Sequence, residues 1–164
     1  MNYTTPSGFR DVLADEAARR EEAAFDVQQL LSRNGYVPVE TPTLEIMDVM
    51  NAGGRVPGTP FKLFDSRGDL LALRPDVTLQ IARMCATRLA GQPGPFRFRY
   101  QERVFREAEG RPQAEAREMT QVGVELIGEA GPAADAEVIA LLAESLERVE
   151  VGNFRISVAT VGVL

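Results

Sequence analysis

Histidine is absent from this 164-residue sequence, and cysteine occurs only once, at Cys85. The absence of histidine removes the commonest general base and a common metal ligand. A single cysteine cannot form an internal disulfide, which fits the reducing environment of the cytoplasm. Cys85 lies in an apolar helical run with Ile81, Met84 and Leu89. We therefore expect an inert core thiol rather than a nucleophile.

Several other signatures are also missing. No apolar run approaches the roughly 20 residues of a membrane span, and the first ten residues lack the apolar stretch of a signal peptide. The chain has no Walker phosphate loop, no dinucleotide glycine fingerprint and no zinc-ligand spacing, and it cannot supply the usual nucleophilic triad. The net charge of −6 argues against a broad surface for nucleic acid or membrane, but it leaves room for a local basic groove.

What is present is an ordinary globular composition, 45% hydrophobic and 26% charged, at about one domain's length. Hydrophobic periodicity and the positions of glycine and proline predict the elements. We expect helices over 15–33, with Asp15 near the N-cap, and over 44–50, 77–90 and 133–149. We expect strands over 36–39, 61–64, 70–73, 96–106, 117–128 and 154–164, the first of them suited to a sheet edge because of Pro38.

This order of elements predicts an α+β fold, an antiparallel sheet flanked by helices. Residues 1–164 are expected to form a single domain. Because the sequence stops directly after an apolar predicted strand, we expect a domain truncated at its C-terminus. A naturally short domain is the alternative.

The segment from Gln121 to Glu125 is the most informative part of the chain. Side chains alternate between the two faces of a strand. Val122 and Val124 therefore point into a core, and Gln121 and Glu125 point the other way, on either side of Gly123. A buried Gln or Glu without a partner would cost about 2–7 kcal/mol. The pattern predicts a polar floor that meets a ligand, water or another side chain. Alternatively, Gly123 permits close packing and Glu125 pairs with an arginine.

Two further places carry groups that suit a ligand. Arg106 and Arg117 stand at the two sides of the predicted 96–128 hairpin, and guanidinium groups bind phosphate or carboxylate in a forked geometry. The alternative is that they pair with nearby acidic residues, namely Glu102, Glu107, Glu109, Glu115 and Glu118. At the start of the 77–90 helix, Asp76 can cap the helix, or it can hold a ligand's ammonium group together with the Thr78 hydroxyl.

Five motifs follow one another in an order that is more specific than any one of them. They are Thr5-Pro6-Ser7-Gly8-Phe9-Arg10-Asp11, Gly35-Tyr36 with Pro42, Leu73-Arg74-Pro75-Asp76-Val77-Thr78, Val104-Phe105-Arg106 and Thr120-Gln121-Val122-Gly123-Val124-Glu125. This set resembles the class II aminoacyl-tRNA synthetase core of histidyl-tRNA synthetases. It is most similar to their non-aminoacylating paralogue, the regulatory subunit of ATP phosphoribosyltransferase.

The resemblance implies roles for particular residues. The positions that match the family's histidine-binding residues, which hold the amino group and side chain of histidine, are Asp76, Thr78, Gln121 and Glu125. Arg106 matches the synthetase arginine that binds the α-phosphate of ATP. Arg117 matches the loop arginine that meets the distal phosphates. Both arginines are expected to be vestigial here. The segment from Tyr36 to Pro42 matches the motif that builds a dimer interface, so a homodimer is expected. No cofactor or metal is implied.

Departures from the synthetase pattern favour the paralogue. Ala108 stands where synthetases carry a glutamate that helps to hold adenine, and Asp76 stands where they usually carry glutamate. The sequence ends before the family's histidine-specific motif, its third motif with a second ATP arginine, and its anticodon-binding domain. Aminoacylation needs positioned ATP and a cationic partner for the developing charge, so catalysis is not expected.

The resemblance therefore implies a regulatory subunit that binds no tRNA and does no chemistry itself. Such a subunit assembles with a short-form ATP phosphoribosyltransferase catalytic subunit, and histidine, as the effector, inhibits this first step of histidine biosynthesis. One alternative is a fragment of a histidyl-tRNA synthetase, which activates histidine with ATP and transfers it to tRNA. The other is a truncated paralogue that serves only as a dimer or assembly module.

Overall fold

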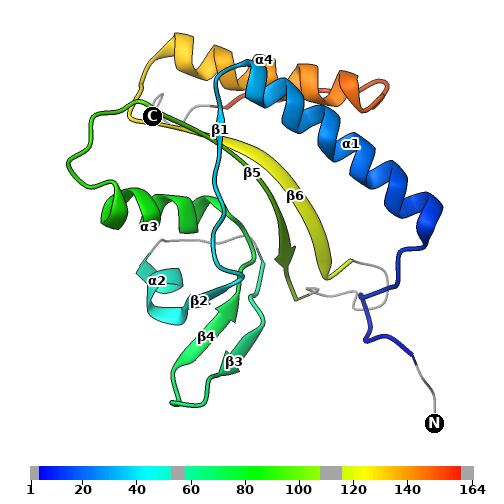
Figure 1. The fold of residues 1–164 in the computed structure, drawn as a ribbon, viewed down its shortest axis with the longest axis vertical. Coiled ribbons are helices and arrows are strands. Elements are labelled where there is room, and N and C mark those ends of the chain that lie inside the picture. The colour runs from blue at the N-terminus through cyan, green and yellow to red at the C-terminus, as the bar shows by residue number, and fades with distance from the viewer. Residues whose placement is uncertain (1–3, 53–57, 108–115, 160–164) are drawn as a thin grey trace.

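The computed structural model describes residues 4–52, 58–107 and 116–159 (Figure 1). Within these ranges the helices are α1 (Ala14–Arg33), α2 (Met47–Ala52), α3 (Thr78–Arg88) and α4 (Pro132–Arg148). The strands are β1 (Val37–Pro38), β2 (Leu44–Ile46), β3 (Lys62–Phe64), β4 (Leu70–Leu73), β5 (Phe96–Phe105) and β6 (Glu118–Ile127). The predicted α+β class is confirmed, but the strands form two three-stranded sheets rather than one.

The larger sheet has the order β1-β5-β6 and carries helices on both faces. Its strands β5 and β6 pair antiparallel over their whole length, and β1 runs parallel to β5 at the edge, as the proline in this segment predicted. Figure 1 shows α1 and α4 together on one side of this sheet and α3 on the other. The polar floor predicted on β6 therefore faces α3.

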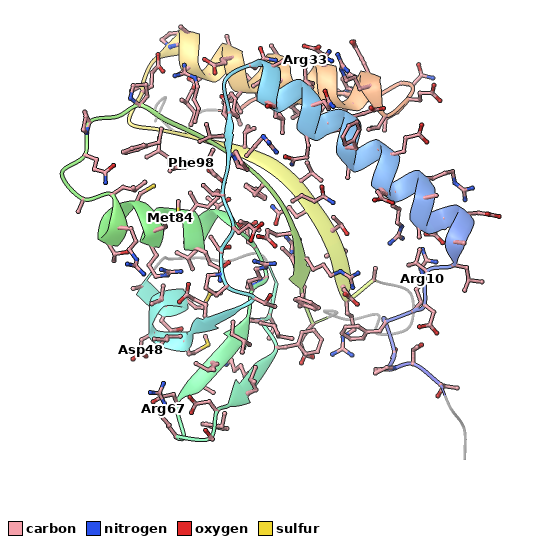
Figure 2. The ribbon with its side chains drawn as sticks, in the orientation of Figure 1. Arg10, Arg33, Asp48, Arg67, Met84 and Phe98 are labelled. Atoms are coloured by element: carbon pink, nitrogen blue, oxygen red, sulfur yellow. The ribbon has the colours of Figure 1, made fainter. Side chains whose placement is uncertain are left out.

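Each face of the larger sheet has its own core. On one face, Val77 and Ile81 of the α3 region pack against Phe98, Tyr100 and Val104 of β5. The side chains of Met84 on α3 and Phe98 on β5 belong to this layer (Figure 2).

The opposite core joins α1, α4 and the segment before β1. It contains Leu30, Leu31, Tyr36 and Leu141, with Val122 and Val124 packed against them. The alternation predicted for residues 121–125 is thus confirmed, because the two valines enter this core and leave the odd-numbered residues to the α3 face.

The smaller sheet has the order β2-β4-β3, and it corrects the prediction of a helix over 44–50. Residues 44–46 form a strand that pairs with β4, and α2 begins only at Met47. In this strand Glu45 is buried and forms an ion pair with Arg83 of α3, at 2.7 Å. A three-residue strand lacks the length to show a period, so its pairing with β4 decided its conformation.

Two smaller predictions also differ from the structure. The N-cap of α1 is Leu13, and Asp15 lies in the first turn, where its charge is favourable next to the positive end of the helix dipole. Residues 154–159 are not a strand, and residues 160–164 lie outside the described part of the chain. No helix in the described ranges combines the length and the apolar character needed to cross a bilayer.

Candidate functional site

The four residues predicted to bind a ligand come together on the α3 face of the larger sheet. Asp76 and Thr78 lie where β4 leads into α3, and Gln121 and Glu125 lie on β6. The Thr78 hydroxyl donates a hydrogen bond to Glu125 Oε1 at 2.6 Å, and Gln121 Nε2 donates to Asp76 Oδ2 at 3.3 Å. The helix start and the strand are therefore joined through the side chains that the sequence singled out.

The two carboxylate oxygens of Asp76 have different partners. Its Oδ1 accepts a hydrogen bond of 2.7 Å from the backbone N–H of Thr78, the first residue of α3. This bond satisfies one of the free N–H groups at the helix start. Its Oδ2 faces Gln121 and lies 4.0 Å from Arg106 Nη2. Asp76 thus supports the start of α3 with one oxygen and belongs to the polar cluster with the other.

Tyr100 lies at the centre of this cluster and was missed by the sequence prediction. It is opposite Gly123 in the β5–β6 register, and its hydroxyl accepts a hydrogen bond from Gln121 Nε2 at 3.3 Å. A Cβ atom added to Gly123 would lie 2.5 Å from the Tyr100 hydroxyl oxygen and 2.6 Å from Cζ. The space above Gly123 is therefore filled by Tyr100. The floor of the candidate site is made by the tyrosine hydroxyl and not, as the sequence predicted, by a bare glycine.

A sequence signal for this arrangement did exist. Phe96, Phe98 and Tyr100 alternate with arginines, which places all three on one face of β5. That face could be predicted, but the residue opposite Tyr100 could not, because it depends on the register with β6.

Burial and like charge make the cluster electrostatically unusual. Burial raises the pKa of Glu125 above its usual value, and the nearby charge of Asp76 raises it further, while the Thr78 hydroxyl acts against both. Burial and the same two carboxylates raise the pKa of Tyr100 to about 12, so its hydroxyl stays protonated at neutral pH. In the described ranges no basic side chain lies within ion-pair distance of Glu125. A cationic ligand group would relieve this imbalance.

The two arginines predicted to meet phosphate have different surroundings. Arg106 Nε donates to the backbone carbonyl of Pro75 at 2.8 Å, which keeps its guanidinium beside Asp76. Arg117 instead lies over the Phe61 ring, 4.4 Å from its centroid, and pairs with Glu107 at 3.3 Å. The structure therefore brings Arg106 to the cluster and engages Arg117 in a packing role.

The structure tests part of the alternative prediction, that these arginines pair with nearby acidic residues. Of the predicted partners, Glu107 does pair with Arg117, whereas Glu102 pairs with Arg74 and Glu118 with Arg103. Glu109 and Glu115 lie outside the described residues, as does Ala108.

A separate cavity of about 420 Å³ lies between the N-terminal segment and the outer ends of β5 and β6. Arg10, Arg20, Arg103 and Glu118 are among its lining residues, and none of the four predicted ligand residues is. In the part of the chain that the structure describes, no group of three histidine, cysteine or acidic side chains is arranged to hold a metal ion.

Comparison with known proteins shows which family the chain resembles over most of its length. Residues 8–164 match the family model described as histidyl-tRNA synthetase. The chain is 42% identical over 163 residues to an ATP phosphoribosyltransferase regulatory subunit of Desulfitobacterium hafniense, covering 99% of this chain and 42% of that protein. A regulatory subunit of Geobacillus kaustophilus is 38% identical over 161 residues, covering 98% of this chain and 41% of that protein. The chain thus spans about two fifths of the length of these relatives.

Solved structures show the same relationship. A protein from Bacillus halodurans, described as an ATP phosphoribosyltransferase regulatory subunit/histidyl-tRNA synthetase, has a TM-score of 0.81 at 35% identity, covering 91% of this chain and 38% of that one. The apo histidyl-tRNA synthetase of S. aureus has a TM-score of 0.74 at 25% identity, covering 88% of this chain and 34% of that one. The chain belongs to the histidyl-tRNA synthetase family and has the α+β fold of its class II catalytic domain.

Proposed function

We propose that this chain is part of a regulatory subunit of ATP phosphoribosyltransferase that senses histidine and does no chemistry itself. The observation that carries the proposal is the cluster around Tyr100. There, the carboxylates of Asp76 and Glu125 share one face of the sheet, and Glu125 has no cationic partner among the described side chains. An amino acid with an ammonium group and a ring N–H offers the charge and the donors that this cluster needs.

Sequence similarity supports the regulatory assignment over a synthetase. The curated relatives that match this chain at 38–42% identity are named as regulatory subunits. Among the solved structures, the synthetases of S. aureus and Nostoc are 25% and 27% identical. A histidine–tRNA ligase subunit of Alicyclobacillus acidocaldarius is 35% identical, as is the regulatory subunit/histidyl-tRNA synthetase of Bacillus halodurans. Asp76 in place of the synthetase glutamate agrees with the regulatory assignment. On this proposal the partner is a short-form catalytic subunit in the cytoplasm, tRNA is not a ligand, and Arg106 and Arg117 do not serve ATP.

The proposed assembly also includes a homodimer through the segment from Tyr36 to Pro42. Tyr36 itself is buried in the α1–α4 core, but Val37 and Pro38 of β1 are exposed at the sheet edge. An exposed edge with apolar side chains is suited to pairing with another chain.

Calorimetry with the full-length gene product tests the assignment of the site. Wild-type protein should bind histidine, and Glu125→Ala should weaken that binding at least about tenfold, because one charge-assisted contact contributes on the order of 1.5–3 kcal/mol. Glu129→Ala is the matched control, since Glu129 is exposed and pairs with Arg97 away from the cluster. Equal histidine affinity in wild type and Glu125→Ala would contradict the assignment.

An activity assay tests the regulatory role. With the catalytic subunit, ATP and phosphoribosyl pyrophosphate, histidine should inhibit the complex of wild-type protein, and Glu125→Ala should need higher histidine concentrations. Feedback of this kind is a coupling free energy between two sites, typically about 1–3 kcal/mol.

A histidine–tRNA ligase is the second candidate, favoured by the family model and by the position of Arg106 beside the cluster. Histidine-dependent pyrophosphate exchange by the full-length protein would support the ligase. Histidine binding without exchange would support the regulatory subunit.

A further inference from the structure

The side-chain amide of Gln121 has an orientation that its neighbours determine. Its Nε2 lies 3.3 Å from Asp76 Oδ2 and 3.3 Å from the Tyr100 hydroxyl oxygen. An ionised carboxylate can only accept hydrogen bonds, so the nitrogen of the amide, not its oxygen, must face Asp76. The two N–H groups of Gln121 are then both used, one on Asp76 and one on Tyr100.

The consequence is an acceptor that is left over. Gln121 Oε1 is shielded from solvent and has no hydrogen-bond partner among the described residues. Buried polar atoms are nearly always paired in folded proteins, and an unpaired acceptor is therefore a feature that calls for a partner. Rotating the amide would not solve the problem, because it would place Oε1 against the Asp76 carboxylate.

Tyr100 has little freedom to move its hydroxyl away from the Gln121 amide. The residue is only 5% exposed, and its ring is held between the core beneath α3 and the bare backbone of Gly123. The hydroxyl is neutral at neutral pH, since the pKa is raised to about 12. It therefore remains an acceptor for the Gln121 amide.

We propose that Tyr100 is a positioning residue, whose hydroxyl fixes the Gln121 amide so that Oε1 is ready to accept a hydrogen bond from an N–H group of the ligand. Gly123 is required for this role because any side chain there would displace the tyrosine ring. The identity of the ligand as histidine rests on the proposed function, but the fixed orientation of the amide does not. A site with a preset acceptor favours ligands that carry a matching donor.

The first experiment measures histidine binding by the full-length gene product. Tyr100→Phe keeps the ring and removes the hydroxyl, and should raise the Kd for histidine about three- to tenfold, the value of one hydrogen bond. In a Gln121→Met background the same change should have no further effect, because Tyr100 acts through Gln121. Tyr36→Phe is the control: it removes the hydroxyl of another buried tyrosine, which donates to Glu137 at 2.8 Å on the opposite face.

The second experiment needs no ligand. Side-chain ¹⁵N relaxation of Gln121 should show a rigid amide in wild type and in Tyr36→Phe, and a more mobile amide in Tyr100→Phe. A mobile Gln121 amide in wild type, or one that is equally rigid in Tyr100→Phe, would overturn the proposal even if no histidine binds. If histidine binds but Tyr100→Phe leaves the Kd unchanged, or weakens it equally in both Gln121 backgrounds, the positioning role is wrong while the histidine site stands.

Discussion

Single residues on the α3 face decide the shape of the candidate site, and the pair formed by Gly123 and Tyr100 shows this most directly. The tyrosine ring lies so close to Gly123 that even a methyl group has no room. The glycine is therefore explained by a protein side chain and not by direct contact with a ligand.

Gly123→Ala should destabilise the protein by about 1–3 kcal/mol, the usual effect of overpacking a tight contact. In a Tyr100→Ala background, Gly123→Ala should destabilise the protein much less, because the ring is the group that the new methyl meets. Urea denaturation of the single and double variants measures both effects. Gly152→Ala is the control, because a Cβ at Gly152 meets no atom within 4 Å. Equal losses from Gly123→Ala with and without the Tyr100 ring would contradict this explanation.

The raised pKa of Glu125 predicts that the stability of a Glu125 variant, relative to wild type, depends on pH. A carboxyl whose pKa is raised on folding contributes stability below its unfolded pKa, near the ordinary value of 4.5, and loses it as the pH rises through the folded pKa. Glu125→Gln should therefore become more stable relative to wild type as the pH rises from about 4 to 8. Thermal melts across this range measure the difference.

Glu137→Gln provides a control of the opposite sign. Hydrogen bonds from Arg97 and Tyr36 lower the pKa of Glu137. Its charge therefore stabilises the fold at neutral pH and does so less as the pH falls through that lowered pKa. This variant should be less stable than wild type at neutral pH and approach it in acid. A Glu125→Gln difference that is flat with pH would show that this carboxyl is not perturbed.

At the scale of elements, a buried arginine ties the two sheets together. Arg74 follows β4 and is only 3% exposed. Its guanidinium donates to the carbonyl oxygens of Thr41 and Arg103, each at 2.7 Å, and to Glu102 at 2.5 Å. It thus connects the end of the smaller sheet, the segment before β2, and the central strand of the larger sheet.

Arg74→Met should destabilise the protein by about 3–5 kcal/mol, because it leaves Glu102 and two carbonyl groups without their cation. Arg67→Met is the control: Arg67 lies at the turn between β3 and β4 (Figure 2), and its side chain is 81% exposed. Exposed ion pairs contribute little, so this change should be nearly neutral. Chemical denaturation compares the two variants, and similar losses in both would show that Arg74 does not join the sheets.

At the scale of the whole molecule, the exposed edge of the larger sheet gives a prediction about assembly. Val37 is 53% exposed on β1, within the segment proposed as the dimer interface. Val37→Glu would place a charge in that interface, and should raise the dimer dissociation constant of the full-length gene product at least about tenfold. Sedimentation equilibrium measures this constant.

Phe25→Glu serves as the matched control for the dimer. Phe25 lies on α1, outside the segment from Tyr36 to Pro42, and is similarly exposed at 58%. The proposed interface does not include it, so its substitution should leave the dissociation constant unchanged. A dimer that tolerates Val37→Glu, or that Phe25→Glu weakens to the same degree, would place the interface elsewhere.

The sequence by itself determined which residues share a face, because the two-residue period of a strand is a local property. It therefore predicted that Gln121 and Glu125 would leave the core together and that Asp76 and Thr78 would stand at a helix start, and the ordered motifs indicated the family. Only the tertiary structure decided the neighbours of these residues. The β5–β6 register placed Tyr100 over Gly123, the pairing with β4 made residues 44–46 a strand, and packing against Phe61 took Arg117 away from the cluster. Contacts of this kind join segments far apart in the chain, and no local pattern records them.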